Sequence, residues 1–448
     1  MRRAPGARSP SRRSPRRSRR RAPGRRDSDT PPAAAVVPPP PRPASRARRG
    51  RRRVGSLAHG SASRYSRRSS SGSTKVKRSA TETAARSARR LALLLFLAPA
   101  AALAAGDGGP RLTFLDSYDV AAGTRLDGTC VGGLSAIAYA GGERYFVLSD
   151  SGREARFYRL KLALATGAGG AAEIAEVAFE RAVRLKTREG LPYPEGRVDP
   201  EGLALLDDRA AFLSSEGAAP LGVPPFVDLV ALDDGAWLAT APLPVAYRPL
   251  ATDGVQVAGV RRNLGLEALA LSPDRRVLYA ATESALAQDA APGKPLYARL
   301  LRFAVGRTTS LAGEYLYPLV EPEGEVIVHG VVELLALDDG GRLLALERTY
   351  GPAIGLAVTL YAVDLEQRAA PGERAHLAAG VRSLPLLVKR PLLDFATLPV
   401  AVENYEGMTL GPPLPGGGQS LLIVGDNDDV DCTAGASRPS RFLLFRLE

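Results

Sequence analysis

Two series of polar residues recur along the chain at nearly constant spacing, and almost all of them are acidic. The first series lies in a repeated apolar phrase and consists of Ser135, Glu201, Glu267, Glu333 and Glu406, which are 66, 66, 66 and 73 residues apart. The second series ends the apolar run that follows each phrase and consists of Asp150, Glu216, Glu283, Glu347 and Asp426. Carboxylate oxygens are common ligands of hard divalent cations such as calcium, which takes about six to eight oxygen ligands in all.

Each phrase and the run after it are joined by a turn rich in Asp and Gly, such as Ser272-Pro273-Asp274. Two strand-forming runs around such a turn are typical of a β-hairpin. The first strand of a hairpin starts at the end where the second strand stops, so both series should converge at one end. A fixed period also indicates one structural unit built several times.

The second half of each unit holds further strand-like runs. In the first unit these are residues 155–162 and 175–185, and in the third they are residues 296–305 and 313–320. Four antiparallel strands per unit predict an all-β fold, a β-propeller of four-stranded blades.

Five blades follow from the five units, with six as the alternative if one sheet does not repeat. The last unit ends with residues 441–447 as its third strand. Residues 111–120 would supply the missing fourth strand and close the ring. A β-solenoid or a stacked sandwich is the other all-β interpretation, but neither needs the chain ends to meet.

The charge of the whole chain, +13, is concentrated in its first part. Residues 1–104 hold 28 Lys or Arg against 3 Asp or Glu, a balance of +25, and the remainder carries a balance of −12. Residues 1–88 lack the apolar pattern needed for a core and predict a disordered basic leader. Their position before an export signal suggests that translation starts later, for example at Val76. The acidic remainder argues against a nucleic-acid partner.

Residues 89–104 resemble a signal peptide. An apolar stretch of fifteen residues, Leu91 to Ala105, follows Arg89 and Arg90. It is shorter than the roughly 20 residues of a membrane span, and it ends near the small-residue site typical of signal cleavage. We therefore expect export to the periplasm or the medium, with residues 105–448 forming the propeller.

The chain has two cysteines, Cys130 and Cys432, which lie close to polar anchors of the first and last units. An oxidising compartment permits a disulfide, and ring closure would bring these two together. Two buried thiols are the alternative.

Several ordered motifs resemble the phytase-like family described as having esterase-like activity. They are Gly132-Gly133-Leu134-Ser135, Asp199-Pro200-Glu201-Gly202-Leu203-Ala204, Arg262-Asn263-Leu264-Gly265-Leu266-Glu267, Ala281-Thr282-Glu283, Asn404-Tyr405-Glu406-Gly407-Met408 and Gly425-Asp426-Asn427. The resemblance spans residues 131–447 and implies an exported bacterial propeller distantly related to metal-dependent phytases. The third motif departs from the family pattern, because Gly-Leu-Glu-Ala stands where Gly-Phe-Glu-Gly is expected.

So many carboxylates at one end require compensating charge, because neighbouring like charges resist joint ionisation. Calcium or another hard divalent cation is the predicted cofactor, with Asp150, Glu201, Glu216, Glu267, Glu283, Glu333, Glu347, Glu406 and Asp426 as candidate ligands. Arg153, Arg262 and Arg348 are candidate counter-ions. Alternatively, each carboxylate fixes blade geometry by accepting backbone hydrogen bonds or pairing with Arg.

The predicted function is hydrolysis of phosphate esters or other esters, with Glu267, Glu406, Arg262 and Arg348 as candidate catalytic residues. A small-molecule ester is the expected partner, and the expected state is a monomer without a membrane span. A Ser135 nucleophile with His329 or His376 as its base is a weaker alternative, because the Ser135 motif lacks the second Gly of a nucleophile elbow. A non-catalytic binding or scaffold propeller with structural calcium is the other alternative.

Overall fold

The computed structural model describes residues 109–290, 295–319, 324–368, 383–428, 431–432 and 438–448. The predicted leader (1–88), the predicted signal peptide (89–104) and His376 lie outside these residues. Within the described ranges, no helix qualifies as a membrane span.

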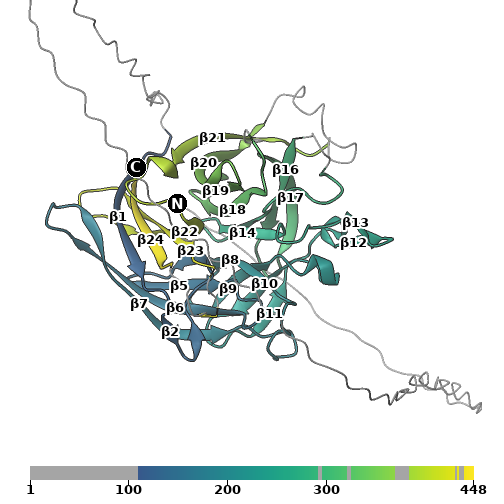
Figure 1. The fold of residues 1–448 in the computed structure, drawn as a ribbon, viewed down its shortest axis with the longest axis horizontal. Helices are drawn as coiled ribbons and strands as arrows, with labels where there is room; N and C mark the ends of the chain where they lie inside the picture. The colour runs from purple at the N-terminus through teal and green to yellow at the C-terminus, as the bar shows by residue number, and fades with distance from the viewer. Residues whose placement is uncertain (1–108, 291–294, 320–323, 369–382, 429–430, 433–437) are drawn as a thin grey trace, which may run out of the picture. The chain divides into compact units, whose positions relative to one another are not determined.

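Five four-stranded antiparallel sheets make up the fold (Figure 1). The first blade consists of β4 (Leu134–Tyr139), β5 (Arg144–Ser149), β6 (Arg156–Thr166) and β7 (Ala172–Arg184). The second consists of β8 (Pro200–Leu205), β9 (Ala210–Ser215), β10 (Phe226–Ala231) and β11 (Trp237–Thr240). The third consists of β14 (Leu266–Leu271), β15 (Val277–Thr282), β16 (Leu296–Ala304) and β17 (Ser310–Leu319).

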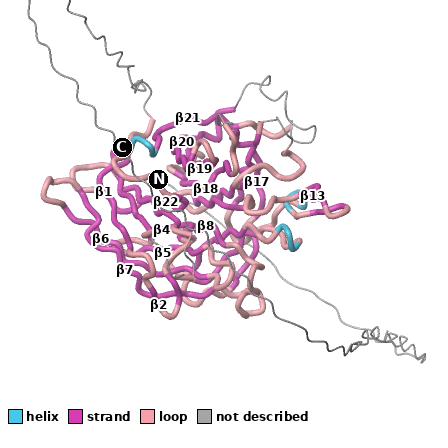
Figure 2. Tube along the Cα trace, viewed as in Figure 1, coloured by secondary structure: helices cyan, strands magenta, loops and turns pink. Residues whose placement is uncertain are grey.

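The fourth blade consists of β18 (Val328–Ala336), β19 (Arg342–Gly351), β20 (Gly355–Arg368) and β21 (Leu387–Asp394). The fifth combines β22 (Asn404–Pro413), β23 (Gln419–Asp426) and β24 (Ser440–Leu447) with β1 (Leu112–Val120) from the start of the described chain. Two short hairpins lie outside the blades, β2 (Arg125–Leu126) with β3 (Thr129–Cys130) and β12 (Leu250–Thr252) with β13 (Val255–Ala258). Strands dominate the described chain, and the helices in it are single 3₁₀ turns (Figure 2).

The first strand of each blade contacts the first strands of the two neighbouring blades. The contacts run from β4 to β8, β14, β18 and β22, and from β22 back to β4. This closed circle makes the fold a propeller of five blades and rules out the six-bladed alternative.

The ring closes as predicted, through its two chain ends. β1 pairs antiparallel with β24 from Leu112 opposite Leu447 to Val120 opposite Ser440. Cys130 and Cys432 form a disulfide near this junction, with Cα atoms 5.3 Å apart. The disulfide joins residues 302 positions apart in the sequence.

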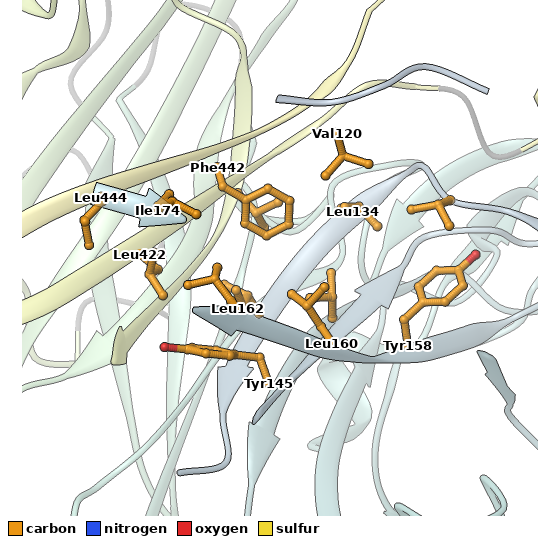
Figure 3. Close-up of a cluster of buried hydrophobic side chains, with 14 of the residues drawn as sticks. Val120, Leu134, Tyr145, Tyr158, Leu160, Leu162, Ile174, Leu422, Phe442 and Leu444 are labelled. Carbon is orange, nitrogen blue, oxygen red and sulfur yellow. The ribbon is translucent and has the colours of Figure 1, made fainter. Parts of the chain in front are cut away.

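The hydrophobic core consists of five main clusters, one between each pair of adjacent blades. In the cluster between the first and fifth blades, Leu160 and Tyr158 of β6 share one core with Phe442 of β24 and Leu422 of β23 (Figure 3). Successive side chains of a strand face opposite sides of its sheet. Each blade therefore packs against both neighbours, and the ends of the inner strands are held in fixed positions around the central axis.

Candidate functional site

The anchor residues of the first series lie at irregular points of the inner strands. Pairing shifts between Leu134 and Ala136 in β4, and between Leu266 and Ala268 in β14. The same shift occurs in β8 and β22, so Ser135, Glu201, Glu267 and Glu406 all lie at such shifts. A bulged residue leaves the regular ladder and its side chain is re-aimed. Glu201, Glu267 and Glu406 consequently line one cavity.

The fourth blade departs from the predicted register by one residue. Val331 pairs with Glu347 and Glu333 with Leu346, so the bulged residue of β18 is Val332. Gly330 pairs with Arg348, as Asn404 pairs with Asp426 in the fifth blade. A slip of one residue turns every side chain of a strand to the other face of its sheet. The structure therefore brings Val332 and Arg348, and neither Glu333 nor Glu347, to the positions of the two acidic series.

Glu333 and Glu347 have partners elsewhere. The Glu333 carboxylate accepts hydrogen bonds from the backbone amides of Leu334 (2.9 Å) and Leu269 (3.3 Å), which link two blades. Glu347 accepts one from the Tyr317 hydroxyl at 2.5 Å and forms an ion pair with Lys389. Neither residue lines the cavity to which Glu201, Glu267 and Glu406 belong, which we call the axial cavity. We therefore no longer count either residue among the candidate metal ligands.

The remaining predicted ligands converge on a cavity of about 710 Å³. Nine carboxylates line it, those of Asp150, Asp199, Glu201, Glu216, Glu267, Glu283, Glu406, Asp426 and Asp428. The rest of the lining consists of Asn263, Val328, Arg348, Tyr350, Leu356, Val402, Asn404 and Arg438. Among the described residues, all five blades reach this cavity, and its potential ligand atoms are almost all oxygens.

Three groups of carboxylates are close enough to share an ion. They are Asp199 with Glu201 and Glu216, Glu201 with Glu267 and Glu406, and Glu216 with Glu267 and Glu283. In each group, one oxygen from every residue lies within 4.8 Å of the others. In addition, Oδ1 of Asp150 is buried and has no hydrogen-bond partner among the described residues. An oxygen-only donor set with such an unsatisfied buried acceptor fits a hard cation such as calcium.

Burial and mutual repulsion oppose ionisation of this cluster. Burial raises the pKa of Asp199 to about 6, and burial together with Arg348 and neighbouring carboxylates sets the pKa of Glu406 at about 7. For Glu216, burial and then the charge of Glu283 raise the pKa to about 8. The pKa of the Glu267 carboxyl lies well above its usual range for the same two reasons. A cation in the cavity would lower all of these values, because it favours the ionised form.

Arg348 is the basic residue that lies deepest in the cavity lining. Its guanidinium donates hydrogen bonds to Glu283 (2.9 Å) and Asn404 (2.6 Å) and forms an ion pair with Glu406. Its side chain is 16% exposed, against 2% for Glu283 and 6% for Glu406. Arg348 thus neutralises part of the cluster, which is one of the two roles expected from the sequence.

The other predicted arginines lie outside this cavity. Arg262 is exposed and lines a neighbouring pocket of about 440 Å³, which shares Asp199, Glu216 and Asn263 with the axial cavity. Arg153 is exposed and pairs with Glu195 at 3.1 Å and with Asp431 at 3.2 Å.

A serine–histidine pair is not assembled from Ser135 and His329. The Ser135 hydroxyl is buried and donates to the carbonyl oxygen of Pro200 at 3.3 Å. His329 has Nδ1 at 2.6 Å from the Thr349 hydroxyl, and it lines a different pocket. Neither residue is in the lining of the axial cavity.

Asp199 and Asn404 are site residues that the spacing argument missed. Each lies two positions before a bulged Glu, where Gly133, Gly265 and Gly330 stand in the other blades. Asn404 donates hydrogen bonds to Glu406 (3.0 Å) and Asp426 (3.1 Å). The sequence signal for both is a polar residue two positions before the anchor. Asp428 and Arg438, which lie 3.7 Å apart at the cavity, come from a loop that does not repeat.

Solved structures and protein families were compared with this chain. Structural resemblance extends to an N-acetylgalactosamine deacetylase from F. plautii, with 10% identity, a TM-score of 0.38, and coverage of 74% of this chain and 95% of that one. The periplasmic gluconolactonase of Pseudomonas aeruginosa has 12% identity and a TM-score of 0.31, with 71% of this chain and 86% of that one covered. Likenesses at this level carry no argument about the fold or the reaction.

No curated protein matches the sequence. The pattern of one protein family, by contrast, matches residues 129–429, which include the inner hairpins of all five blades, from β4–β5 to β22–β23. Since this match covers well over half of the chain, the protein belongs to the phytase-like family, described as "esterase-like activity of phytase".

Proposed function

We propose that this protein is an exported hydrolase that depends on a divalent cation, with calcium as the favoured ion, and acts on phosphate esters in the axial cavity. The observation that carries the proposal is the convergence of three groups of carboxylates in one cavity of about 710 Å³. Within each group, one oxygen of every residue lies within 4.8 Å of the others. This volume lies in the range of small-molecule sites. The disulfide Cys130–Cys432 agrees with an oxidising compartment.

The candidate ligands are the carboxylates of the three groups together with Asp150. Asp199, Glu201 and Glu216 come from the second blade, and Glu267 comes from the third. These side chains sit at strand ends whose backbones are paired, which limits their movement and favours a preformed site. A bound calcium supplies Lewis acidity, which offsets the charge of a phosphoryl group and makes an attacking water more acidic.

Glu406 and Glu267 are the proposed acid–base residues. The Glu406 pKa of about 7 allows this carboxyl to exchange a proton near neutral pH. Arg348 holds Glu406 in place, and Asn404 donates a second hydrogen bond to it. Glu267 is buried and belongs to two of the three groups, one with Glu201 and Glu406 and one with Glu216 and Glu283. It can therefore either bind the cation or accept a proton.

Arg262 and Arg438 are the proposed contacts for an anionic substrate. Both are exposed, and each lies beside carboxylates of the cavity without blocking its interior. Charge-assisted hydrogen bonds from Arg are well suited to phosphate oxygens. They would also offset the repulsion between an anionic ester and the acidic lining.

Purified protein should be assayed on 4-nitrophenyl phosphate and 4-nitrophenyl acetate, with calcium and with a chelator. Phosphatase turnover that is lost on chelation, lost in Glu267→Gln and kept in Ser135→Ala supports the proposal. Turnover of the acetate alone would favour a carboxylic ester or lactone as substrate. A fall in stability on chelation without any turnover would favour the scaffold interpretation and overturn the proposed activity.

A further inference from the structure

Five equivalent positions surround the axial cavity at the ends of the second strands, and one of them has the opposite charge. Strand pairing places Arg348 opposite Gly330, as Asp426 lies opposite Asn404. Backbone hydrogen bonds of 2.9 Å from Asp150 to Gly133 and of 2.7 Å from Glu283 to Gly265 define the same position in other blades. The second blade has Glu216 there. Four blades thus supply a carboxylate and the fourth blade supplies a guanidinium.

The guanidinium spans the cavity between the two blades that flank its own. Nη2 donates to Glu283 of the third blade, and Nη1 contacts Asn404 and Glu406 of the fifth. Its Nε is buried and has no hydrogen-bond partner among the described residues. Both terminal nitrogens are therefore committed to protein partners rather than directed toward solvent.

Arg348 divides the three carboxylate groups into two kinds. The group of Glu201, Glu267 and Glu406 contains a partner of Arg348, and so does the group of Glu216, Glu267 and Glu283. The group of Asp199, Glu201 and Glu216 contains none. A fixed positive charge a few ångströms away repels a divalent cation strongly where water is excluded.

We propose that the positive charge of the Arg348 guanidinium determines where in the axial cavity divalent ions bind and how many of them bind. It occupies the Glu267–Glu283–Glu406 side of the cavity and confines the divalent ion to the side of Asp199, Glu201 and Glu216. This inference rests on the proposed function, because it assumes that the cavity binds divalent cations. It goes further in assigning the position of the ion and in giving Arg348 a role separate from substrate binding.

The test counts calcium ions bound per chain by titration calorimetry and equilibrium dialysis. Arg348→Gln should bind one calcium more than the wild type, since it frees Glu283 and Glu406. Arg441→Gln is a matched control, because the Arg441 side chain is 17% exposed and pairs with two carboxylates, Asp119 and Glu403, outside the cavity. The control should bind as many calcium ions as the wild type. A folded Arg348→Gln variant with an unchanged count would overturn the inference.

A second measurement does not depend on the folding of a variant. Anomalous scattering from wild-type crystals soaked with Mn²⁺ should place the ion against Asp199, Glu201 and Glu216. An ion held by Glu283 and Glu406 with Arg348 turned away would contradict the inference, as would crystals that take up no ion. A normal ion count without phosphatase activity would instead overturn only the reaction proposed above.

Discussion

The backbone amide of Gly265 donates a hydrogen bond of 2.5 Å to the carboxylate of Glu216, across the boundary between the third and second blades. A Cβ atom at Gly265 would lie 2.6 Å from Cα of Glu216, so this close approach requires glycine. The segment before the inner strand of one blade thus positions the cavity carboxylate of the blade before it, Glu216.

Gly265→Ala should therefore displace Glu216 and weaken calcium binding at least about tenfold, equivalent to roughly 1.4 kcal/mol. Titration calorimetry of the variant checks this. Gly169→Ala is the control, since Gly169 lies in the turn between β6 and β7, where an added Cβ meets nothing within 4 Å. Equal affinity in Gly265→Ala and the wild type would show that Glu216 is not a ligand.

Removing one charge from the cavity should stabilise the protein without metal. In Glu216→Gln the amide oxygen of Gln can still accept the hydrogen bond from the Gly265 amide. The substituted side chain cannot ionise, so folding no longer buries a group that would be charged in the unfolded chain. One pKa unit corresponds to about 1.4 kcal/mol. We therefore expect the free energy of unfolding, measured in a chelator, to rise by at least about 1 kcal/mol, and calcium binding to be lost.

Chemical denaturation with and without calcium measures both effects. Glu333→Gln is the matched control, because Glu333 is also buried but its carboxylate faces backbone amides. It should keep wild-type calcium affinity. Lost calcium binding in Glu333→Gln would contradict the placement of Glu333 outside the site.

The metal-free protein should become less stable as the pH rises. Folding raises the pKa values of Asp199, Glu406 and Glu216 to about 6, 7 and 8, from ordinary values of 3.8 for Asp and 4.5 for Glu. Groups with raised values favour the folded state below their unfolded pKa, and this contribution is lost as the pH passes through the folded values. The melting temperature in a chelator should fall between about pH 4 and about pH 8.

Calcium should reverse this slope, since the ion binds the ionised carboxylates and its affinity increases as protons leave. Differential scanning calorimetry across the same pH range, with saturating calcium and with a chelator, makes the comparison. Parallel pH profiles in the two conditions would be inconsistent with calcium binding in this cavity.

Much of the fold followed from the sequence because strand ends and ring closure obey simple rules. Seven of the nine predicted carboxylate ligands line one cavity because hairpins return to their starting edge. The run at residues 111–120 likewise predicts the strand that completes the last blade. The five-bladed count needed only the repeat.

The fourth blade could not be predicted in the same way. Glu333 lies 66 residues after Glu267, but the bulge of β18 falls on Val332, one residue earlier. The apolar phrase around Glu333 is compatible with both registers, and the pairing that selects one of them forms only in the sheet. Because side chains alternate, this single step exchanged Glu347 for Arg348 at the cavity and reversed the charge there.

The displaced Glu347 should matter for stability and not for calcium binding. Lys389 and Glu347 have side chains only 5% and 3% exposed, and they form a buried ion pair beneath Tyr317 and Tyr361. Lys389→Met removes one partner and leaves an uncompensated buried carboxylate, which costs about 3–5 kcal/mol. Urea denaturation measures the loss.

The double variant Lys389→Met/Glu347→Gln should recover much of this stability, because no unpaired charge remains. Both variants should bind calcium as the wild type does. Loss of calcium binding in a folded double variant would show that Glu347 is a calcium ligand after all.

The disulfide should stabilise both the ring and one side of the cavity. It joins Cys130, the last residue of β3, to Cys432 in the loop between β23 and β24, which begins with Asn427. The Asn427 side chain accepts a hydrogen bond of 3.1 Å from the amide of Gly133, so the same junction also carries a polar contact between the first and fifth blades. A cross-link over 302 residues restricts the unfolded chain strongly, and loss of a native disulfide typically costs about 2–5 kcal/mol.

We expect Cys130→Ser/Cys432→Ser to lose stability in this range and to bind calcium more weakly, because Asp426 and Asp428 would be less firmly held. Denaturation and calorimetric titration of the double variant, compared with the reduced wild type, test both effects; unchanged stability in the two samples would show that the β1–β24 pairing alone closes the ring.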